Sequence, residues 1–280
     1  MTKADTMRML RKVPAVTLFF WVIKVLATTV GETAADFLNE NLGLGLTVTT
    51  VVMGVLLVIA LVFQFRARMY VPGIYWVAVV LISIVGTLIT DNLTDNLGVS
   101  LVTTTVVFAI ALAVVFLSWY ASEHTLSIHS IYTTKREAFY WLAILFTFAL
   151  GTAAGDLIAE RLAVGYFWSL VLFASMIAAV WVGYRFFRLN EVVAFWIAYI
   201  LTRPLGASTG DLLSQPRSAG GLGLGTAVTT GIFLLTILAV VIYLSVTKVD
   251  VDRSHARASL DLGPSPALGG VLAVERVEQD

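Results

Sequence analysis

Acidic side chains recur at a fixed spacing in this chain, and they are of the type that binds cations or protons. An aspartate follows each of four tryptophans by fifteen positions, and an acid or an amide follows each by nineteen. Carboxylate oxygens supply the ligands and the negative charge that a hard cation needs. The aspartates are Asp36, Asp91, Asp156 and Asp211, and the second set is Glu40, Asp95, Glu160 and Gln215.

Further polar residues lie in the same apolar segments. Hydroxyls that we expect to flank the aspartates open the second helix of each copy, at Thr49, Thr104 and Thr229. Lys24 and Glu32 occur only in the first copy and Arg203 only in the fourth. Charges inside apolar spans are functional candidates by default, so we expect Lys24 and Arg203 each to neighbour an acid or a water-filled cavity, with Glu32 as a partner for either. An ion pair that serves assembly alone is the alternative.

The acids belong to a repeated unit. The tryptophans Trp21, Trp76, Trp141 and Trp196 are 55, 65 and 55 residues apart, and ten positions after them lie Gly31, Gly86, Gly151 and Gly206. These glycines begin small-xxx-small patterns, which favour close helix packing. Only the fourth copy needs an insertion, of five residues, in the Gln215–Gly221 loop. A two-helix unit has therefore been duplicated twice.

Composition places these units in a membrane. Of 280 residues, 59% are hydrophobic and 13% charged, with no cysteine. We predict an all-α polytopic integral membrane protein of about eight transmembrane helices. The first apolar run continues to about Leu38, too long for a signal peptide, so we expect it to be retained. The expected helices are 13–38, 44–65, 72–94, 99–120, 138–160, 164–187, 191–214 and 223–246.

The same pattern divides the chain. Repeats are expected at 13–66, 70–120, 138–188 and 190–246, with a cytoplasmic N-terminus at 1–12, a cytoplasmic loop at 121–137 and a disordered cytoplasmic tail at 247–280. Because each repeat holds two spans, all four copies have one orientation and equivalent residues lie at one depth. The four aspartates should then form a ring.

The ring has two interpretations. An aspartate near a helix C-terminus faces the negative end of the helix dipole, so a bound cation, shared protons, or Lys24 and Arg203 would have to compensate. A metal ion at Asp36, Asp91, Asp156 and Asp211 is the first interpretation. Alternatively, each helix ends at its glycine and the aspartate only caps the following turn.

Basic residues predict the orientation. Fourteen Lys and Arg residues lie on the side of the termini, whereas the connections within repeats hold only Arg161 and Arg217. Such residues concentrate on the cytoplasmic side of a membrane. Both termini are therefore expected in the cytoplasm.

The repeated segments carry a resemblance. FWVIKVLATTVGETAADFL, YWVAVVLISIVGTLITDNL, YWLAILFTFALGTAAGDLI and FWIAYILTRPLGASTGDLL resemble a bacterial membrane family of four tandem two-helix repeats, each with one Trp, catalogued as a repeat of unknown function. The resemblance implies an eight-helix protein of the bacterial inner membrane and no particular activity. The Gly-Asp step in repeats three and four is also similar to acidic motifs of cation exporters.

Our leading hypothesis is a secondary transporter or exporter of a small cation, with a divalent metal such as manganese as the best substrate and protons coupled through the carboxylates. A membrane structural or assembly protein, whose acids only cap helices, is the alternative. An enzyme is disfavoured because no nucleophile–base pair is visible. The expected partners are the lipid bilayer and a small cation or proton, with no nucleic acid and no cofactor.

Overall fold

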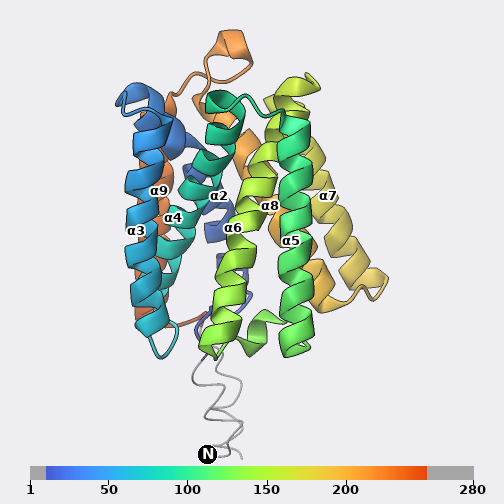
Figure 1. Ribbon diagram of the computed structural model, residues 1–280. Helices are drawn as coiled ribbons and strands as arrows, with labels where there is room; N and C mark the ends of the chain where they lie inside the picture. The colour runs from blue at the N-terminus through green and yellow to red at the C-terminus, as the bar shows by residue number, and fades with distance from the viewer. Residues whose placement is uncertain (1–10, 251–280) are drawn as a thin grey trace, which may run out of the picture.

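In the computed structural model, which describes residues 11–250, eight long helices form and no strand does (Figure 1). The first helices of the repeats are α2 (Leu18–Asp36), α4 (Pro72–Asp91), α6 (Thr134–Asp156) and α8 (Glu191–Ser214). The second helices are α3 (Leu46–Arg66), α5 (Leu101–Glu123), α7 (Tyr166–Phe186) and α9 (Thr226–Thr247). All eight are long and apolar enough to cross a membrane. The predicted all-α, eight-helix fold is confirmed, and it is compatible with a multi-pass membrane protein.

The two kinds of helix occupy different layers. The first helices form an inner ring, in which α2 and α6 each contact both α4 and α8. Between 56 and 67% of the most apolar stretch of each inner helix is buried, against 11 to 28% in the outer helices. The outer helices expose valines, leucines and phenylalanines along their length. Such surfaces suit a hydrocarbon environment.

The outer helices link the repeats into a closed circle. Each packs mainly on the inner helix of the next repeat: α3 on α4, α5 on α6 and α7 on α8. The last outer helix, α9, packs on α2 and so joins the fourth repeat to the first. The four copies are therefore arranged around one central axis, as expected for parallel repeats.

Glycines set the spacing of the inner ring. A Cβ atom added to Gly31 would lie 1.9 Å from Ser83 Oγ, one on Gly86 2.7 Å from Phe148 Cβ, and one on Gly151 2.5 Å from Arg203 Cβ. Gly206 closes the circle, since its Cβ would lie 2.0 Å from Thr28 Oγ1. In every case the partner stands seven positions after the Trp of the next repeat. Each of the four glycines therefore makes the equivalent close contact with the inner helix of the neighbouring repeat.

The bundle has two distinct ends. The connections within repeats all lie at one end, here called the loop end, and Figure 1 shows the connections between repeats at the other, the tail end. The five-residue insertion of the fourth repeat lies at the loop end and contains a short 3-10 turn, η5 (Arg217–Ala219). At the tail end, residues 11–15 are fixed by backbone hydrogen bonds, among them Ala15 N–H to Asp250 O at 3.0 Å and Tyr70 N–H to Arg11 O at 2.9 Å.

Two helix starts differ from the predicted ones. The first helix begins at Leu18 rather than at residue 13, because residues 13–16 form no regular structure and the Thr17 hydroxyl caps the helix. α6 begins at Thr134 rather than 138, since Thr133 caps a first turn whose charges hid it from a hydropathy pattern. The connection before α6 contains another 3-10 turn, η3 (Ile128–Ser130). The predicted tails 1–12 and 247–280 lie outside the described residues, apart from 11–12 and 247–250.

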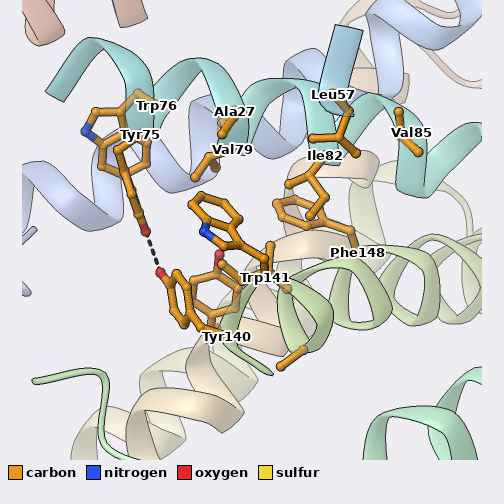
Figure 2. Packing of buried hydrophobic residues seen from close by; sticks show 14 of the residues in the cluster. Ala27, Leu57, Tyr75, Trp76, Val79, Ile82, Val85, Tyr140, Trp141 and Phe148 are labelled. Atoms are coloured by element: carbon orange, nitrogen blue, oxygen red, sulfur yellow. Dashed lines mark hydrogen bonds between the residues drawn. The ribbon is translucent and has the colours of Figure 1, made fainter. Parts of the chain in front are cut away.

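The repeat tryptophans pack in the core toward the tail end. Trp76 and Trp141 are 2% and 3% exposed. Figure 2 shows the neighbouring tyrosines joined across the inner ring, with the Tyr75 and Tyr140 hydroxyls 2.5 Å apart. The Trp141 ring lies 5.5 Å from that of Tyr75. Aromatic packing of this kind stabilises a core beyond the area it buries.

The glycine contacts predict a graded sensitivity to added methyl groups. Gly86→Ala should lower the free energy of unfolding by about 1–3 kcal/mol, because its Cβ overlaps Phe148 at the root of that side chain. Gly54→Ala, on the outer helix α3, meets no atom within 4 Å and serves as the control. Thermal unfolding of the purified protein in detergent measures both. Equal stability of the two variants would contradict the glycine-spaced ring.

Candidate functional site

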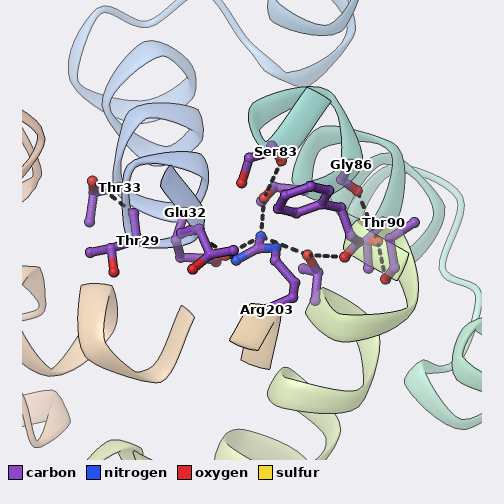
Figure 3. Close-up of polar contacts among 12 residues, drawn as sticks. Thr29, Glu32, Thr33, Ser83, Gly86, Thr90 and Arg203 are labelled. Atoms are coloured by element: carbon purple, nitrogen blue, oxygen red, sulfur yellow. Dashed lines mark hydrogen bonds and ion pairs between the residues drawn. The ribbon is translucent and has the colours of Figure 1, made fainter. Parts of the chain in front are cut away.

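One arginine side chain crosses the central axis. Arg203, on α8, stands seven positions after its repeat Trp and extends toward the loop end (Figure 3). Its Nη2 donates to Glu32 Oε2 and to Thr152 Oγ1, each at 2.7 Å, and it also contacts Thr87 Oγ1. These three partners stand eleven positions after the Trp of repeats one, three and two. We call Glu32, Thr87 and Thr152 the eleventh layer.

The contacts of Arg203 join residues from all four repeats. Arg203 also donates through Nη1 to the backbone carbonyl of Thr28 on α2, at 3.2 Å. The arginine side chain is fully buried and that of Glu32 is 9% exposed. A buried charge is tolerated only when it is paired and hydrogen-bonded. Arg203 has the acidic partner that the sequence suggested.

Lys24 does not have one. Its Nζ is buried and has no hydrogen-bond partner within residues 11–250. It lies instead over two aromatic rings, 3.9 Å from the centroid of Phe148 and 4.2 Å from that of Tyr199. The faces of aromatic rings attract cations, which partly offsets the missing acid. Of the two cations for which Glu32 was a candidate partner, Arg203 pairs with it and Lys24 does not.

The repeated aspartates lie one turn beyond the eleventh layer, about 6 Å further along the helices. Asp211 is 6% exposed and the other three are half-buried. Asp36, Asp91 and Asp156 end their α-helices, and each is followed by a single π-helical turn: η1 (Phe37–Asn41), η2 (Asn92–Asn96) and η4 (Leu157–Arg161). Such turns are frequent at functional sites.

These aspartates do not cap helices. The helices continue past the repeat glycines, and the side chains of Asp36, Asp91 and Asp156 make no capping hydrogen bond. Within the described chain, none of the four carboxylates accepts a hydrogen bond from another side chain. The capping interpretation is therefore wrong for these positions.

The carboxylates are close enough to repel one another. Glu32 acts electrostatically on all four aspartates, and Asp36 acts on each of the other three. Within residues 11–250, however, no three acids, histidines or cysteines are gathered tightly enough to hold a metal ion. The four aspartates thus surround a common acidic region and do not form a chelating group in this conformation.

The remaining candidates lie around this region. Glu40, Asp95 and Glu160 are exposed at the loop end. Thr104 and Thr229 donate to backbone carbonyls of their own helices, and buried Thr49 Oγ1 has no described partner. No recorded contact joins these three threonines to an aspartate. The hydroxyls near the aspartates come instead from Thr87 and Thr152, which lie one helical turn further from the loop end.

A second buried ion pair lies at the tail end. Lys12 Nζ is 2.7 Å from Glu137 Oε2 and also donates to the Phe65 carbonyl at 3.0 Å. Gln64 Nε2 donates to the other oxygen of the carboxylate at 3.0 Å. Glu137 is fully buried. This pair fastens the N-terminal segment to α3 and α6.

A third polar contact closes the same end. The Tyr70 hydroxyl donates to Asp250 Oδ2 at 2.5 Å. Burial is the main cause that raises the pKa of Asp250 and that of Tyr70 above their usual values. The hydrogen bond joins the connection between repeats one and two to the end of the described chain.

A cavity opens away from the axis. It measures ≈ 540 Å³ and is lined mainly by apolar residues of α2, α7 and α8, including Trp21, Trp181 and Phe195. None of the eleventh-layer residues or repeated aspartates lines it. It is separate from the axial charges.

The family comparison agrees with the repeat geometry. The model of the family described as "Repeat of Unknown Function (DUF347)" matches residues 19–70, 74–125, 139–189 and 194–250. Each match covers one inner and one outer helix. The chain belongs to this family. Neither the curated proteins nor the solved structures give a match.

Two features of the structure were not predicted from the sequence. Thr87 and Thr152 share the register of Glu32, so aligning the position eleven after each Trp would have found them. The Lys12–Glu137 pair has no such signal, because neither residue lies in a repeated position. Sequence spacing detects what the repeats share and not what the connections contribute.

The axial ion pair predicts non-additive stability. Glu32→Ala and Arg203→Ala should each lower the free energy of unfolding by about 3–5 kcal/mol, since each leaves a buried charge unpaired. The double variant should lose clearly less than the sum of the two. Thermal unfolding in detergent gives all three values, with Lys24→Met as a control that removes an unpaired charge and should cost little. Additive losses would contradict the pairing.

Proposed function

We propose that the protein is a secondary transporter or exporter of a small cation, with a divalent metal such as manganese as substrate and protons as the coupling ion. The observation that supports it best is the set of four axial aspartates that accept no hydrogen bond from the described chain. Charged groups without partners are costly inside a bundle unless something else neutralises them. Cations and protons are the species that do so.

The axis itself suggests a path. Starting from the loop end, it is polar through the aspartates and the eleventh layer, where the guanidinium of Arg203 blocks it. Beyond Arg203 the inner ring presents the buried apolar residues Phe148, Val79 and Ile144 together with the buried Lys24, which lies over the Phe148 ring. A cation that enters from the loop end therefore reaches the aspartates first, and transport requires the Arg203 network to separate.

The aspartates are too far apart for a rigid metal site, and their arrangement fits a wide entrance that attracts ions. A region of one charge sign concentrates ions of the opposite sign, even without direct ligation. A small divalent cation that keeps part of its water shell is bound through few carboxylates. In this proposal the ring attracts the hydrated cation, and movement of the inner helices brings carboxylates together around it.

We further propose a bacterial inner-membrane location with both termini in the cytoplasm, which follows from the distribution of Lys and Arg. A reporter fused to the C-terminus should be active in the cytoplasm, and one inserted after Gln215 should be active in the periplasm. Paired fusions that report on opposite faces of the membrane provide the measurement. The reverse pattern would place the aspartates on the cytoplasmic side and overturn the proposed direction of entry.

Transport should depend on the charge of the ring. Asp156→Asn keeps the size of the side chain and removes its charge, so expression should persist while metal flux falls about tenfold or more, given the 1.5–3 kcal/mol of an ionic interaction. Glu191→Gln, at an exposed acid that begins α8 at the tail end, is the control and should have little effect. Cellular manganese content of expressing cells measures the flux. If Asn at all four positions leaves metal content unchanged, this function is wrong.

A further inference from the structure

The eleventh layer presents more acceptor oxygens to Arg203 than the nitrogen at its centre can satisfy. Three oxygens, from Glu32, Thr87 and Thr152, converge on the single atom Nη2 of Arg203. That nitrogen carries only two hydrogens, so it cannot donate a separate hydrogen bond to each of three acceptors. Three acceptors around one point suit a spherical cation, which has no fixed number of donors.

The two hydroxyls are oriented for this role. Thr87 Oγ1 donates its hydrogen to the Ser83 carbonyl at 3.2 Å, and Thr152 Oγ1 donates to the Phe148 carbonyl at 3.1 Å. With their hydrogens used inside their own helices, both oxygens present only lone pairs to the axis. Both threonines are fully buried. The layer therefore offers acceptors alone, whatever occupies it.

The arginine is an incompletely satisfied occupant. Arg203 Nε is buried and has no hydrogen-bond partner among the described residues, and buried Ser83 Oγ, in the same region, has none either. The next residue, Pro204, lies inside α8 and cannot donate to the Ile200 carbonyl. A proline at this position weakens the helix and permits it to bend. The guanidinium is thus held on a segment that can withdraw it.

We propose that Glu32, Thr87 and Thr152 form a binding site for one desolvated monovalent metal cation, and that Arg203 is a tethered competitor for it. The layer has a single carboxylate, which balances one positive charge and is too little for a divalent ion. Two of the three oxygens, Glu32 Oε2 and Thr152 Oγ1, also lie 2.7 Å from the occupied point, wider than the 2.0–2.1 Å that Mg²⁺ requires. Sodium or potassium ions meet both conditions.

This inference rests on the proposed function, because the cation reaches the layer along the same axial path. It adds a second ion to that function. Occupation of the layer by a metal cation requires that Arg203 leave, and return of Arg203 expels the cation. Binding of the monovalent ion is therefore coupled to the opening of the axis.

The test is cation-dependent unfolding of the purified full chain in detergent, in NaCl, KCl or choline chloride at equal ionic strength. Arg203→Ala should show an unfolding temperature that rises and saturates with Na⁺ or K⁺ but not with choline. The Na⁺ or K⁺ concentration that gives half of this rise should be at least about tenfold lower than for any response of the wild type, because Arg203 no longer competes for the site. Adding Thr87→Val and Thr152→Val should abolish the response while Glu32 keeps its charge.

The tail-end pair supplies the matched control. Lys12→Ala also leaves a buried carboxylate, Glu137, but its neighbours are the Gln64 amide and the Phe65 carbonyl instead of two hydroxyl acceptors, so it should show no cation selectivity. An equal response of Lys12→Ala, an equal response to choline, or a response that survives the two Val substitutions would overturn the proposal. If Arg203→Ala yields no folded protein even in NaCl or KCl, Arg203→Gln, which lacks the charge, is measured in its place. Because these measurements use purified protein, they fail or succeed independently of cellular manganese content.

Discussion

The structure depends on placing one guanidinium at the centre of a four-helix ring. A buried arginine must satisfy its charge and its N–H groups within reach of its own side chain. Arg203 meets most of this demand with side-chain oxygens from three repeats and the Thr28 carbonyl. Gly151 leaves room for its stem, since a Cβ there would lie 2.5 Å from the arginine Cβ and Cγ. The fourth repeat has Ala207 where the others have an acid or a hydroxyl. One copy therefore provides the cation and the other three provide its acceptors.

Near-symmetry makes this placement possible. Each outer helix packs on the next inner helix, so the circle of repeats closes without a special joining element. The glycine contact is the same at all four interfaces, which fixes equivalent residues at one depth. The copies then differ mainly along the axis, where Lys24, Glu32, Phe148 and Arg203 break the repeat. Residues shared by all copies build the scaffold, and residues unique to one copy carry the charge.

That division explains what sequence could predict. The spacing of the tryptophans and glycines predicts the eight helices, the parallel repeats and the close contacts, because these properties recur in every copy. The partners of Arg203 lie 171, 116 and 51 residues away, and their meeting depends on the rotation of each inner helix about its own axis. Lys24 shows the same limit: spacing along its own helix suggested Glu32, whereas packing directs it toward aromatic rings of α6 and α8. Lys12 and Glu137 meet only because the segment before the first repeat packs against the tail end of the bundle.

Two buried ion pairs lie at different levels of the bundle, Arg203 with Glu32 toward the loop end and Lys12 with Glu137 at the tail end. A buried pair is a modest stabiliser, because the attraction between its members is largely cancelled by the loss of their hydration. When such a pair separates into water, hydration returns as the attraction is lost, so the two changes offset each other. An apolar plug of equal size has no such compensation, since opening it exposes hydrocarbon to water. In the proposed transporter, the Arg203–Glu32 pair therefore holds the axial path shut while keeping the cost of opening small, because the hydration that returns offsets the attraction that is lost.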